Sequence, residues 1–282
     1  MTTAPMRIRH IVGALLNREN TPALRSYATF ADALRDSDTY EDSQLIEVVK
    51  EKTKRYRDTL TSSTARAVTT RQAVQNMFVL SYVEPQRKIN VLEIGGACGA
   101  SYFETKHLLP NRIAHWSIAE TPAMAAAGAD LNSDASVNSD PGLSFHSDLA
   151  AAAAQLASRD LATAQGVLQY AGDPLQMLRA LFELQFSFVY VTRTAVADVG
   201  SPVFIKQDTE LAAHGPGYLP NAPKGRSTQP MTLVSRKSLL SVVPANYEIV
   251  FEFDEAAERI LSIEDDRVTV RDVGFLARLQ PH

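Results

Sequence analysis

The stretch of sequence that decides the fold is residues 91–101, which read VLEIGGACGAS. An apolar run typical of a buried strand leads into Gly95, Gly96 and Gly99, and a segment that favours a helix follows. A glycine-rich turn of this kind lets backbone N–H groups approach a ligand closely at the carboxyl end of a strand. A tight strand-to-helix turn that binds nothing would give the same pattern, and the turn alone does not separate the two interpretations.

The spacing of the glycines argues against two common phosphate-binding motifs. A dinucleotide fingerprint needs glycine at its first, third and sixth positions, but Ala97 and Ala100 occupy the third and sixth places counted from Gly95. No Gly-Lys-Ser/Thr follows, so a P-loop does not fit either. The pattern that fits is an acidic residue, Glu93, followed by Gly95, Ala97 and Gly99 at alternate positions. A nicotinamide-dependent reductase is therefore disfavoured.

Strand-like and helix-like segments alternate from residue 88 onward. We expect strands at 90–94, 113–119, 143–146, 161–165 and 186–192, and helices at 101–109, 122–131, 149–158 and 174–184. This alternation predicts right-handed crossovers and a doubly wound, mostly parallel α/β sheet. Strands at 247–253 and 273–279, joined by a polar link, would complete a seven-stranded sheet whose last strand is antiparallel.

Two further segments frame the expected sheet. Residues 1–87 read as a helical extension, with helices at 43–57 and 70–82, which we expect to cover the cleft of a main domain at 88–282. Residues 194–231 are rich in Gly and Pro, and we expect an irregular segment that serves as a lid or binding loop.

Composition excludes several classes of function. The 282 residues carry a formal net charge of −4, which weakens a case for broad binding to nucleic acid or to anionic membranes. The single cysteine, Cys98, excludes an internal disulfide and a Cys-cluster zinc site, and it fits a reducing compartment. No apolar run reaches the ~18–20 residues that span a bilayer, and the run at 11–16 is too short for a signal peptide. We therefore expect a cytoplasmic protein without membrane insertion.

Polar residues follow the ends of the other expected strands. Glu120 ends the second strand, 21 residues after Gly99, where it could accept hydrogen bonds from both hydroxyls of a ribose or simply begin a helix. Asp148 follows the third strand and could cap a helix. Gln165 and Tyr170 follow the fourth strand. Features at four successive strand ends are far less probable by chance than any one of them.

From about Asp38 to the C-terminus the chain resembles a bacterial family of class I S-adenosylmethionine (SAM)-dependent methyltransferases. The resemblance rests on the 91–99 motif with Tyr102 and Phe103 after it, and on GVLQYAGDP at 166–174. Further matches are Thr39-Tyr40, Trp116, Glu120-Thr121-Pro122, Thr192-Arg193-Thr194 and Gln207. The match is poorest at 209–231.

The resemblance implies a class I methyltransferase fold, with SAM as cofactor and S-adenosylhomocysteine (SAH) as product. It also implies in-line transfer of a methyl group to oxygen or nitrogen of a small-molecule or sugar-containing acceptor. The cofactor would lie against the ends of four strands, with Asp148 near the adenine. The residues implied in cofactor binding are Glu93, Gly95, Gly96, Ala97, Gly99, Glu120, Thr121, Ser147, Asp148, Leu149, Gln165, Gly166 and Val167.

Tyr170, Arg193 and His214 are the candidates for acceptor binding or catalysis. Tyr170 and Arg193 lie at strand ends that face the expected acceptor pocket, and Arg193 would suit a carboxylate or phosphate. An ordinary salt bridge remains open for Arg193, and a structural role remains open for His214. We expect the charged run at 50–57 to be a solvated helix face, and 264–266 to be a turn rather than a metal site.

A rival interpretation is a non-catalytic protein with a methyltransferase fold, which senses a ligand or scaffolds a biosynthetic complex. No residue stands out as a general base, which favours the rival, although many such enzymes work by proximity alone. The expected partner in either case is a small molecule. The sequence leaves the acceptor and a homodimer open.

Overall fold

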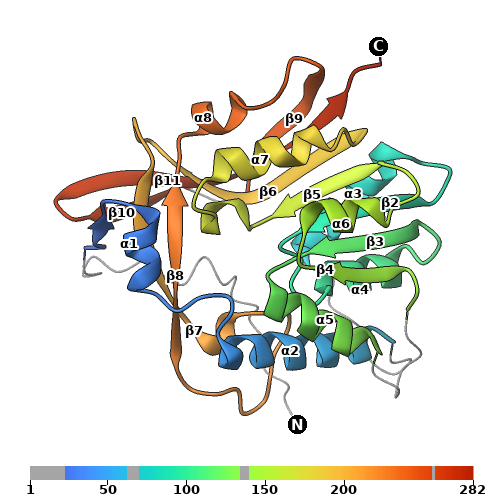
Figure 1. Ribbon diagram of the computed structural model, residues 1–282, viewed down its shortest axis with the longest axis horizontal. Coiled ribbons are helices and arrows are strands. Elements are labelled where there is room, and N and C mark those ends of the chain that lie inside the picture. The colour runs from blue at the N-terminus through green and yellow to red at the C-terminus, as the bar shows by residue number, and fades with distance from the viewer. Residues whose placement is uncertain (1–22, 62–69, 134–139, 256–257, 282) are drawn as a thin grey trace, which may run out of the picture.

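The computed structural model describes residues 23–61, 70–133, 140–255 and 258–281. Its central feature is an eight-stranded sheet in the order β10-β11-β6-β5-β2-β3-β4, with β9 also paired to β11 (Figure 1). The strands are β2 (Ile89–Ile94), β3 (Ile113–Ala119), β4 (Leu143–His146), β5 (Leu161–Gln165), β6 (Phe188–Ala197), β9 (Tyr247–Asp254), β10 (Arg259–Ile263) and β11 (Asp266–Leu279). The direction of winding reverses between β2 and β5, where doubly wound sheets bind their ligands.

The sheet confirms the expected fold class. Strands β2 to β6 pair in parallel, and β11 runs antiparallel to β6 and to β9. Every residue of β2 is buried, as is typical of a parallel strand covered on both faces. The expected count of seven strands is wrong because the polar link before β11 contains a further strand, β10, which pairs with the first part of β11.

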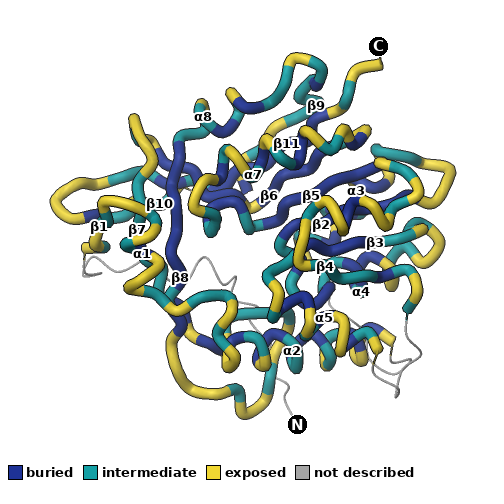
Figure 2. Tube along the Cα trace, viewed as in Figure 1, coloured by how far each residue is buried: buried dark blue, intermediate teal, exposed yellow. Residues whose placement is uncertain are grey.

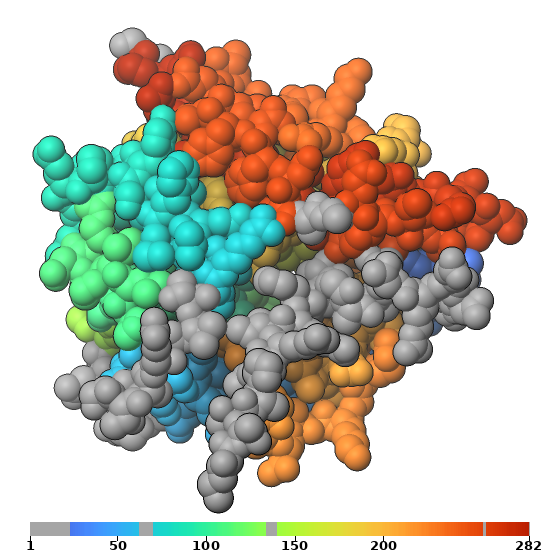
Figure 3. All heavy atoms as spheres, turned by 180° about the vertical axis from the view of Figure 1, so that it is seen from behind, coloured from blue at the N-terminus to red at the C-terminus, as the bar shows by residue number. Residues whose placement is uncertain are grey.

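Helices cover both faces of this sheet. Helices α6 (Leu149–Ala154), α7 (Pro174–Glu183) and α8 (Arg236–Leu240) pack on one face, whereas α3 (Arg71–Val83) and α4 (Ala100–Leu108) pack on the other. Their starts follow the capping rule, because Thr70, Asp148 and Asp173 each accept a hydrogen bond from a backbone N–H of the first turn. Figure 3 shows α3 beside the C-terminal strands, where Phe78 of α3 lies 5.8 Å from Phe251 of β9, measured between ring centroids.

The described part of the N-terminal segment is mostly helical. Helices α1 (Phe30–Arg35) and α2 (Ser43–Thr61) precede α3, so both expected helices are confirmed. The exception is β1 (Ser26–Tyr27), a short strand that pairs with β7. Helix α2 packs against α4 and α5 (Pro122–Ser133), beside the ends of the central strands. Residues 1–22 and 62–69 of the expected extension lie outside the described residues.

The Gly- and Pro-rich segment is more regular than its composition predicts. Strands β7 (Val203–Glu210) and β8 (Arg226–Leu233) form an antiparallel hairpin, and β1 completes a three-stranded sheet. Most of the glycines and prolines fall in the connection between the two strands. Pro230 lies within β8, which is tolerated because β8 is an edge strand and no partner needs its missing N–H.

The second sheet is joined to the first. Figure 2 shows β8 buried along most of its length, because it contacts the end of β6, α1 and the short 3-10 helix η2 (Leu168–Tyr170). The backbone N–H of Ala197 at the end of β6 donates to the carbonyl of Val234, directly after β8, at 2.9 Å. The hairpin therefore lies near the carboxyl ends of the central strands, where the sequence places the candidate site.

Candidate functional site

The glycine-rich turn follows β2 and contains three residues in the left-handed region. Gly95 has φ 70, Ala97 φ 48 and Gly99 φ 86. The backbone N–H of Gly95 donates to the Ala119 carbonyl at the end of β3, at 2.9 Å. Left-handed φ is easy for glycine but costs about 1–2 kcal/mol at an alanine, so the contacts around Ala97 must hold it there.

Part of the glycine requirement comes from the protein's own side chains. A Cβ on Gly95 would lie 2.4 Å from Cγ2 of Val167, and a Cβ on Gly96 would lie 2.7 Å from Oε2 of Glu93. Both distances are too short for an undisturbed contact, so a larger residue at either position would have to displace Val167 or Glu93, whether or not a ligand binds. These contacts also place Glu93 and Val167 directly against the turn.

Glu93 supports the turn from within the sheet. Its side chain is buried, and Oε2 accepts a hydrogen bond from Nε1 of Trp116 on β3 at 2.9 Å. Burial raises the pKa of Glu93 to about 7, although the hydrogen bond from Trp116 opposes that shift. Glu93 therefore lies beneath the turn and supports its backbone.

Glu120 links the end of β3 to the turn. Its Oε1 accepts a hydrogen bond from the backbone N–H of Ala97 at 2.9 Å, and its Oε2 accepts one from the N–H of Thr121 at 2.8 Å. Burial raises the pKa of Glu120, and the two backbone N–H groups oppose that rise. Each carboxylate oxygen still has a second acceptor position. The buried hydroxyl of Thr121 has no hydrogen-bond partner among the described residues, so the end of β3 holds a further group that can form a hydrogen bond.

The end of β4 carries Ser147, Asp148 and Leu149. Asp148 Oδ1 accepts a hydrogen bond from the backbone N–H of Ala151 at 2.7 Å, so the capping role expected for Asp148 is confirmed. Ser147 and Asp148 are exposed, and Leu149 begins α6. The backbone N–H of Glu120 donates to the His146 carbonyl at 2.9 Å, which brings this strand end beside that of β3.

The end of β5 meets both α3 and β6. Gly166 has φ 74, and its backbone N–H donates to the carbonyl of Thr192 at 2.8 Å. The side chain of Gln72 on α3 donates to the buried Gln165 side chain. The N-terminal extension therefore contacts the end of β5 directly.

Arg193 lies at a bulge in β6 and is exposed. The register between β6 and β11 shifts at this point, Arg193 has φ 54, and its backbone N–H donates to the Glu255 carboxyl group. Its guanidinium bends back over Gly166 and donates to the Gln165 carbonyl at 2.8 Å. The acceptor of this hydrogen bond is an uncharged backbone carbonyl, so the bond does not neutralise the positive charge of Arg193.

Tyr170 and His214 are brought together by a residue from the N-terminal extension. The ring of Tyr40 lies 5.2 Å from that of Tyr170 and 6.1 Å from that of His214, both measured between centroids. The Tyr170 hydroxyl donates to Oε1 of Gln207 on β7 at 2.6 Å. Burial raises the pKa of Tyr170, and it raises the pKa of Tyr40 well above its ordinary value. Both phenols are therefore neutral hydrogen-bonding groups at neutral pH.

Two nitrogen bases, the partly buried His214 and the buried Lys52, lie beside this aromatic group. Nε2 of His214 lies 2.7 Å from Oγ1 of Thr209 on β7. Burial, and then the nearby charge of Lys52, lower the pKa of His214 to about 4. Lys52 donates to the Ala212 carbonyl at 2.9 Å, and burial lowers its pKa to about 8. The expectation of a solvated face at 50–57 is therefore wrong for Lys52, and also for Arg57, whose side chain is buried.

Sequence reasoning missed four residues around Tyr170 and His214: Tyr40, Lys52, Thr209, and Gln229 of β8, whose Oε1 lies 3.3 Å from the Thr209 hydroxyl. Tyr40 stood in the Thr39-Tyr40 pair that matched the family, and this was the one available signal. Lys52 contacts the connection between β7 and β8, whereas Thr209 and Gln229 contact each other across the hairpin, and no local pattern encodes either contact.

Neither metal-binding clusters nor membrane-spanning helices were found in the described residues. No group of three or more His, Cys, Asp or Glu side chains in that part of the chain could hold a metal ion. No helix there is long and apolar enough to cross a membrane.

Comparison with known proteins found likeness only among solved structures. No protein-family model and no curated protein matches the chain. The N-terminal domain of EvdMO1, solved in the presence of SAH and D-fucose, is 12% identical with a TM-score of 0.45, and the match covers 82% of this chain and 96% of that one. A SAM-dependent methyltransferase from Clostridium acetobutylicum ATCC 824 is 10% identical with a TM-score of 0.43, covering 76% and 93%.

A third similar structure is SAM-bound CalS10, an amino pentose methyltransferase from Micromonospora echinaspora involved in calicheamicin biosynthesis. It is 13% identical with a TM-score of 0.40, and the match covers 71% of this chain and 89% of that one.

Proposed function

We propose that this chain is a SAM-dependent methyltransferase that acts on oxygen or nitrogen of a small-molecule or sugar-containing acceptor. The observation that carries the proposal is the hydrogen bond between the Glu120 carboxyl group and the glycine-rich turn, at the point where the strand order reverses. Nucleoside ligands of doubly wound sheets bind at this point, commonly with an acidic residue on the ribose. The sequence resemblance at 91–99 and 166–174 supports the same ligand.

The residues at the strand ends fit such a ligand in kind and position. Glu120 would accept hydrogen bonds from the ribose hydroxyls through its remaining acceptor positions. Asp148 and Leu149 would lie at the adenine. The rest of the SAM molecule would be lined by the backbone of 95–97 and by Gln165 to Val167. When bound, SAM supplies a methyl group activated by its positively charged sulfur.

The acceptor would lie among Tyr170, Arg193 and His214. The neutral Tyr170 hydroxyl would position the acceptor by hydrogen bonding, and Arg193 would pair with a carboxylate or phosphate on it. His214, neutral at pH 7, could take up a proton. Alignment of the acceptor atom with the methyl group supplies most of the rate in an in-line displacement.

The β7–β8 hairpin would serve as the cover of the acceptor site, together with the N-terminal helices. Gln207 and Thr209 of β7 point toward Tyr170 and His214, as their hydrogen bonds show. Tyr40 and Lys52 contribute from the N-terminal side. A site built from both segments would exclude water from the transfer.

The alternative is a non-catalytic protein that binds SAM for sensing or scaffolding. An assay of SAH formation separates the two functions. The wild-type protein is incubated with SAM and a panel of hydroxylated, amino-bearing and acidic sugars and small molecules, and SAH is measured against a control without acceptor. The proposal predicts that at least one acceptor class raises SAH above the control. SAM binding without SAH from any acceptor class would favour the alternative.

A further inference from the structure

The hydroxyl of Thr209 has three polar neighbours, and their chemistry restricts where its proton can go. Nε2 of His214 lies at 2.7 Å, the backbone carbonyl of Ser227 at 3.2 Å, and Oε1 of Gln229 at 3.3 Å. The two oxygens can only accept hydrogen bonds, whereas a neutral imidazole nitrogen either donates or accepts. Gln229 is fully buried, and its amide nitrogen donates to the Ser227 hydroxyl at 2.5 Å, so Oε1 keeps its orientation toward Thr209.

Counting protons selects one tautomer of His214. If Thr209 donated its single proton to Nε2, the Ser227 carbonyl and the Gln229 oxygen would both face the lone pairs of Thr209 Oγ1, with no proton between the oxygens. If instead Nε2–H donates to Thr209, the Thr209 proton is free to bond to one of the two oxygens. The second arrangement makes two hydrogen bonds instead of one, and it leaves one of the two oxygens, rather than both, without the Thr209 proton. His214 is then protonated on Nε2 and carries its lone pair on Nδ1.

The surroundings of His214 favour a neutral ring. Lys52 of α2 is the positive group beside it, held by the Ala212 carbonyl, and Tyr40 and Tyr170 are neutral phenols. Thr209 of β7, which contacts the ring, and Gln229 of β8, which contacts Thr209, carry no charge. His214 is only partly buried, so part of the residue is exposed at the surface.

We propose that Thr209 is a positioning residue that fixes His214 as the Nε2–H tautomer, so that Nδ1 receives the proton of the acceptor. This inference rests on the proposed methyltransferase function. The acceptor lone pair forms the new bond to the methyl carbon, and the electron pair of the breaking carbon–sulfur bond stays on sulfur. The acceptor proton passes to Nδ1, and the resulting imidazolium later releases it to water. A weak base suffices because the acceptor atom becomes strongly acidic as it gains the methyl group.

The direct test is the tautomer of His214, measured at pH 7 by two-bond nitrogen-15 correlation NMR. Wild type is compared with Thr209→Val, which has the same shape without the hydroxyl, and with Thr209→Ser, which restores the hydroxyl. The exposed His107 serves as an internal reference. We expect Nε2–H in wild type and Thr209→Ser, and a mixture or Nδ1–H in Thr209→Val. An Nδ1–H tautomer in wild type, or a tautomer unchanged in Thr209→Val, would overturn the proposal.

A kinetic arm tests the consequence for catalysis. With an acceptor found by SAH assay, Thr209→Val should lower kcat by about tenfold or more. The loss should not exceed the ~10²–10⁴-fold that a general base contributes, and Thr209→Ser should recover most of the lost kcat. SAM affinity, measured on the same samples, should stay near wild type, whereas the melting temperature should fall in Thr209→Val, because buried acceptors lose their donor, and should recover in Thr209→Ser. An unchanged kcat in Thr209→Val would refute the positioning role. Failure of wild type to bind SAM would instead refute the proposed function, while the tautomer measurement still decides the geometry.

Discussion

The Glu120 side chain accepts a hydrogen bond at 2.9 Å from the backbone N–H of Ala97, a residue held at φ 48 in the glycine-rich turn. A carboxyl group on β3 thus holds the strained residue of the turn that follows β2. The group proposed to bind the ribose therefore also shapes the backbone against which the rest of the ligand would lie.

Glu120→Ala should weaken SAM binding and also lower the stability of the fold. Loss of a partner for two buried hydroxyls should raise the Kd for SAM roughly ten- to hundredfold, or about 1.5–3 kcal/mol. The N–H groups of Ala97 and Thr121 lose their acceptor as well, which should cost a further 1–3 kcal/mol or so of unfolding free energy. Calorimetric titration and denaturant unfolding measure the two effects separately.

Asp173→Ala is the matched control for Glu120→Ala. Asp173 is also a carboxylate that accepts backbone N–H groups, but it caps α7 and is not among the proposed ligand residues. Its loss should cost about 1 kcal/mol of stability and leave SAM affinity unchanged. If Glu120→Ala behaved like this control, Glu120 would have a structural role only.

Gly95→Ala should destabilise the turn through a clash with a single side chain. The new Cβ would lie 2.4 Å from Cγ2 of Val167, and the backbone there has φ 70. We expect a loss of at least about 1–3 kcal/mol and a large loss of SAM affinity, since the turn must move. Thermal unfolding and titration measure both.

Two variants isolate the cause of the Gly95→Ala effect. Adding Val167→Gly removes both Cγ2 and Cβ of Val167, which would lie 2.4 and 2.6 Å from the new Cβ, but not the left-handed strain, so the double variant should recover part of the lost stability. Gly200→Ala is the control, because a Cβ there has no atom within 4 Å. A double variant no more stable than Gly95→Ala would show that the Val167 contact does not govern the turn.

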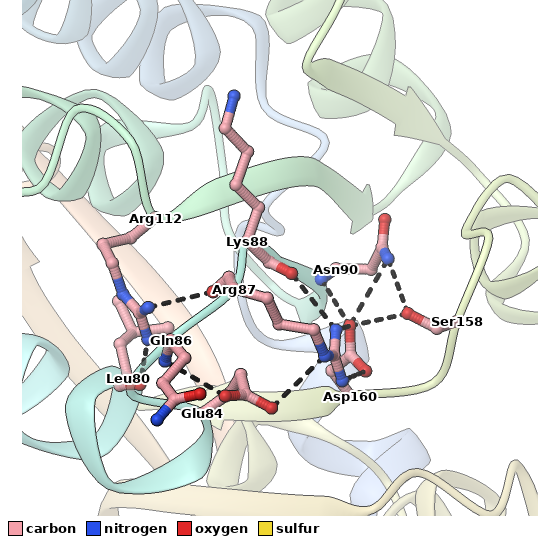
Figure 4. A network of polar contacts seen from close by, with 9 residues as sticks. All are labelled: Leu80, Glu84, Gln86, Arg87, Lys88, Asn90, Arg112, Ser158 and Asp160. Carbon is pink, nitrogen blue, oxygen red and sulfur yellow. Dashed lines mark hydrogen bonds and ion pairs between the residues drawn. The ribbon is translucent and has the colours of Figure 1, made fainter.

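Asp160 should stabilise the fold independently of the candidate site. Figure 4 shows Arg87, Asn90 and Ser158 converging on this buried carboxylate, with Arg87 Nη2 at 2.7 Å and the Asn90 backbone N–H at 2.8 Å. Burial acts to raise the pKa of Asp160, but the hydrogen bonds from Arg87, Asn90 and Ser158 outweigh burial and lower it. The network joins the starts of β2 and β5, at the opposite end of the sheet from the glycine-rich turn.

The sign of the pH dependence follows from that lowered pKa. Because the folded-state pKa lies below the unfolded value of about 3.9, this stabilisation is fully present above pH ~4 and is lost as pH falls through the folded pKa. Asp160→Asn should cost about 1–3 kcal/mol at pH 7, and its difference from wild type should shrink toward acid pH. Asp198→Asn, at an exposed pair with Arg271, should cost less than about 1 kcal/mol. A constant Asp160→Asn deficit down to pH 2 would contradict this account.

The central sheet could be predicted because each of its strands has a local signature. Strands 113–119, 143–146 and 161–165 form with the expected bounds, since parallel strands covered on both faces are short apolar runs between helix caps. Strands β7 and β8 could not be predicted, because their composition resembles that of a loop. Their pairing partners are each other and β1, and β1 lies far away in the sequence.

The candidate site likewise contains residues that the sequence predicts and residues that it does not. The turn and Glu120 lie at strand ends that the alternation of elements reveals. Lys52 and Thr209 carry no local signal, since their burial depends on the packing of α2 against the connection after β7. His214 could be named from its residue type, but its partner Thr209 could not.

The most direct test of the account is a calorimetric titration of the wild-type protein with SAM, SAH and NAD under the same conditions. The account predicts micromolar affinity for SAM and SAH and no heat of binding for NAD, because the turn lacks the glycine that lets a pyrophosphate approach. Binding of NAD without binding of SAM or SAH would contradict it.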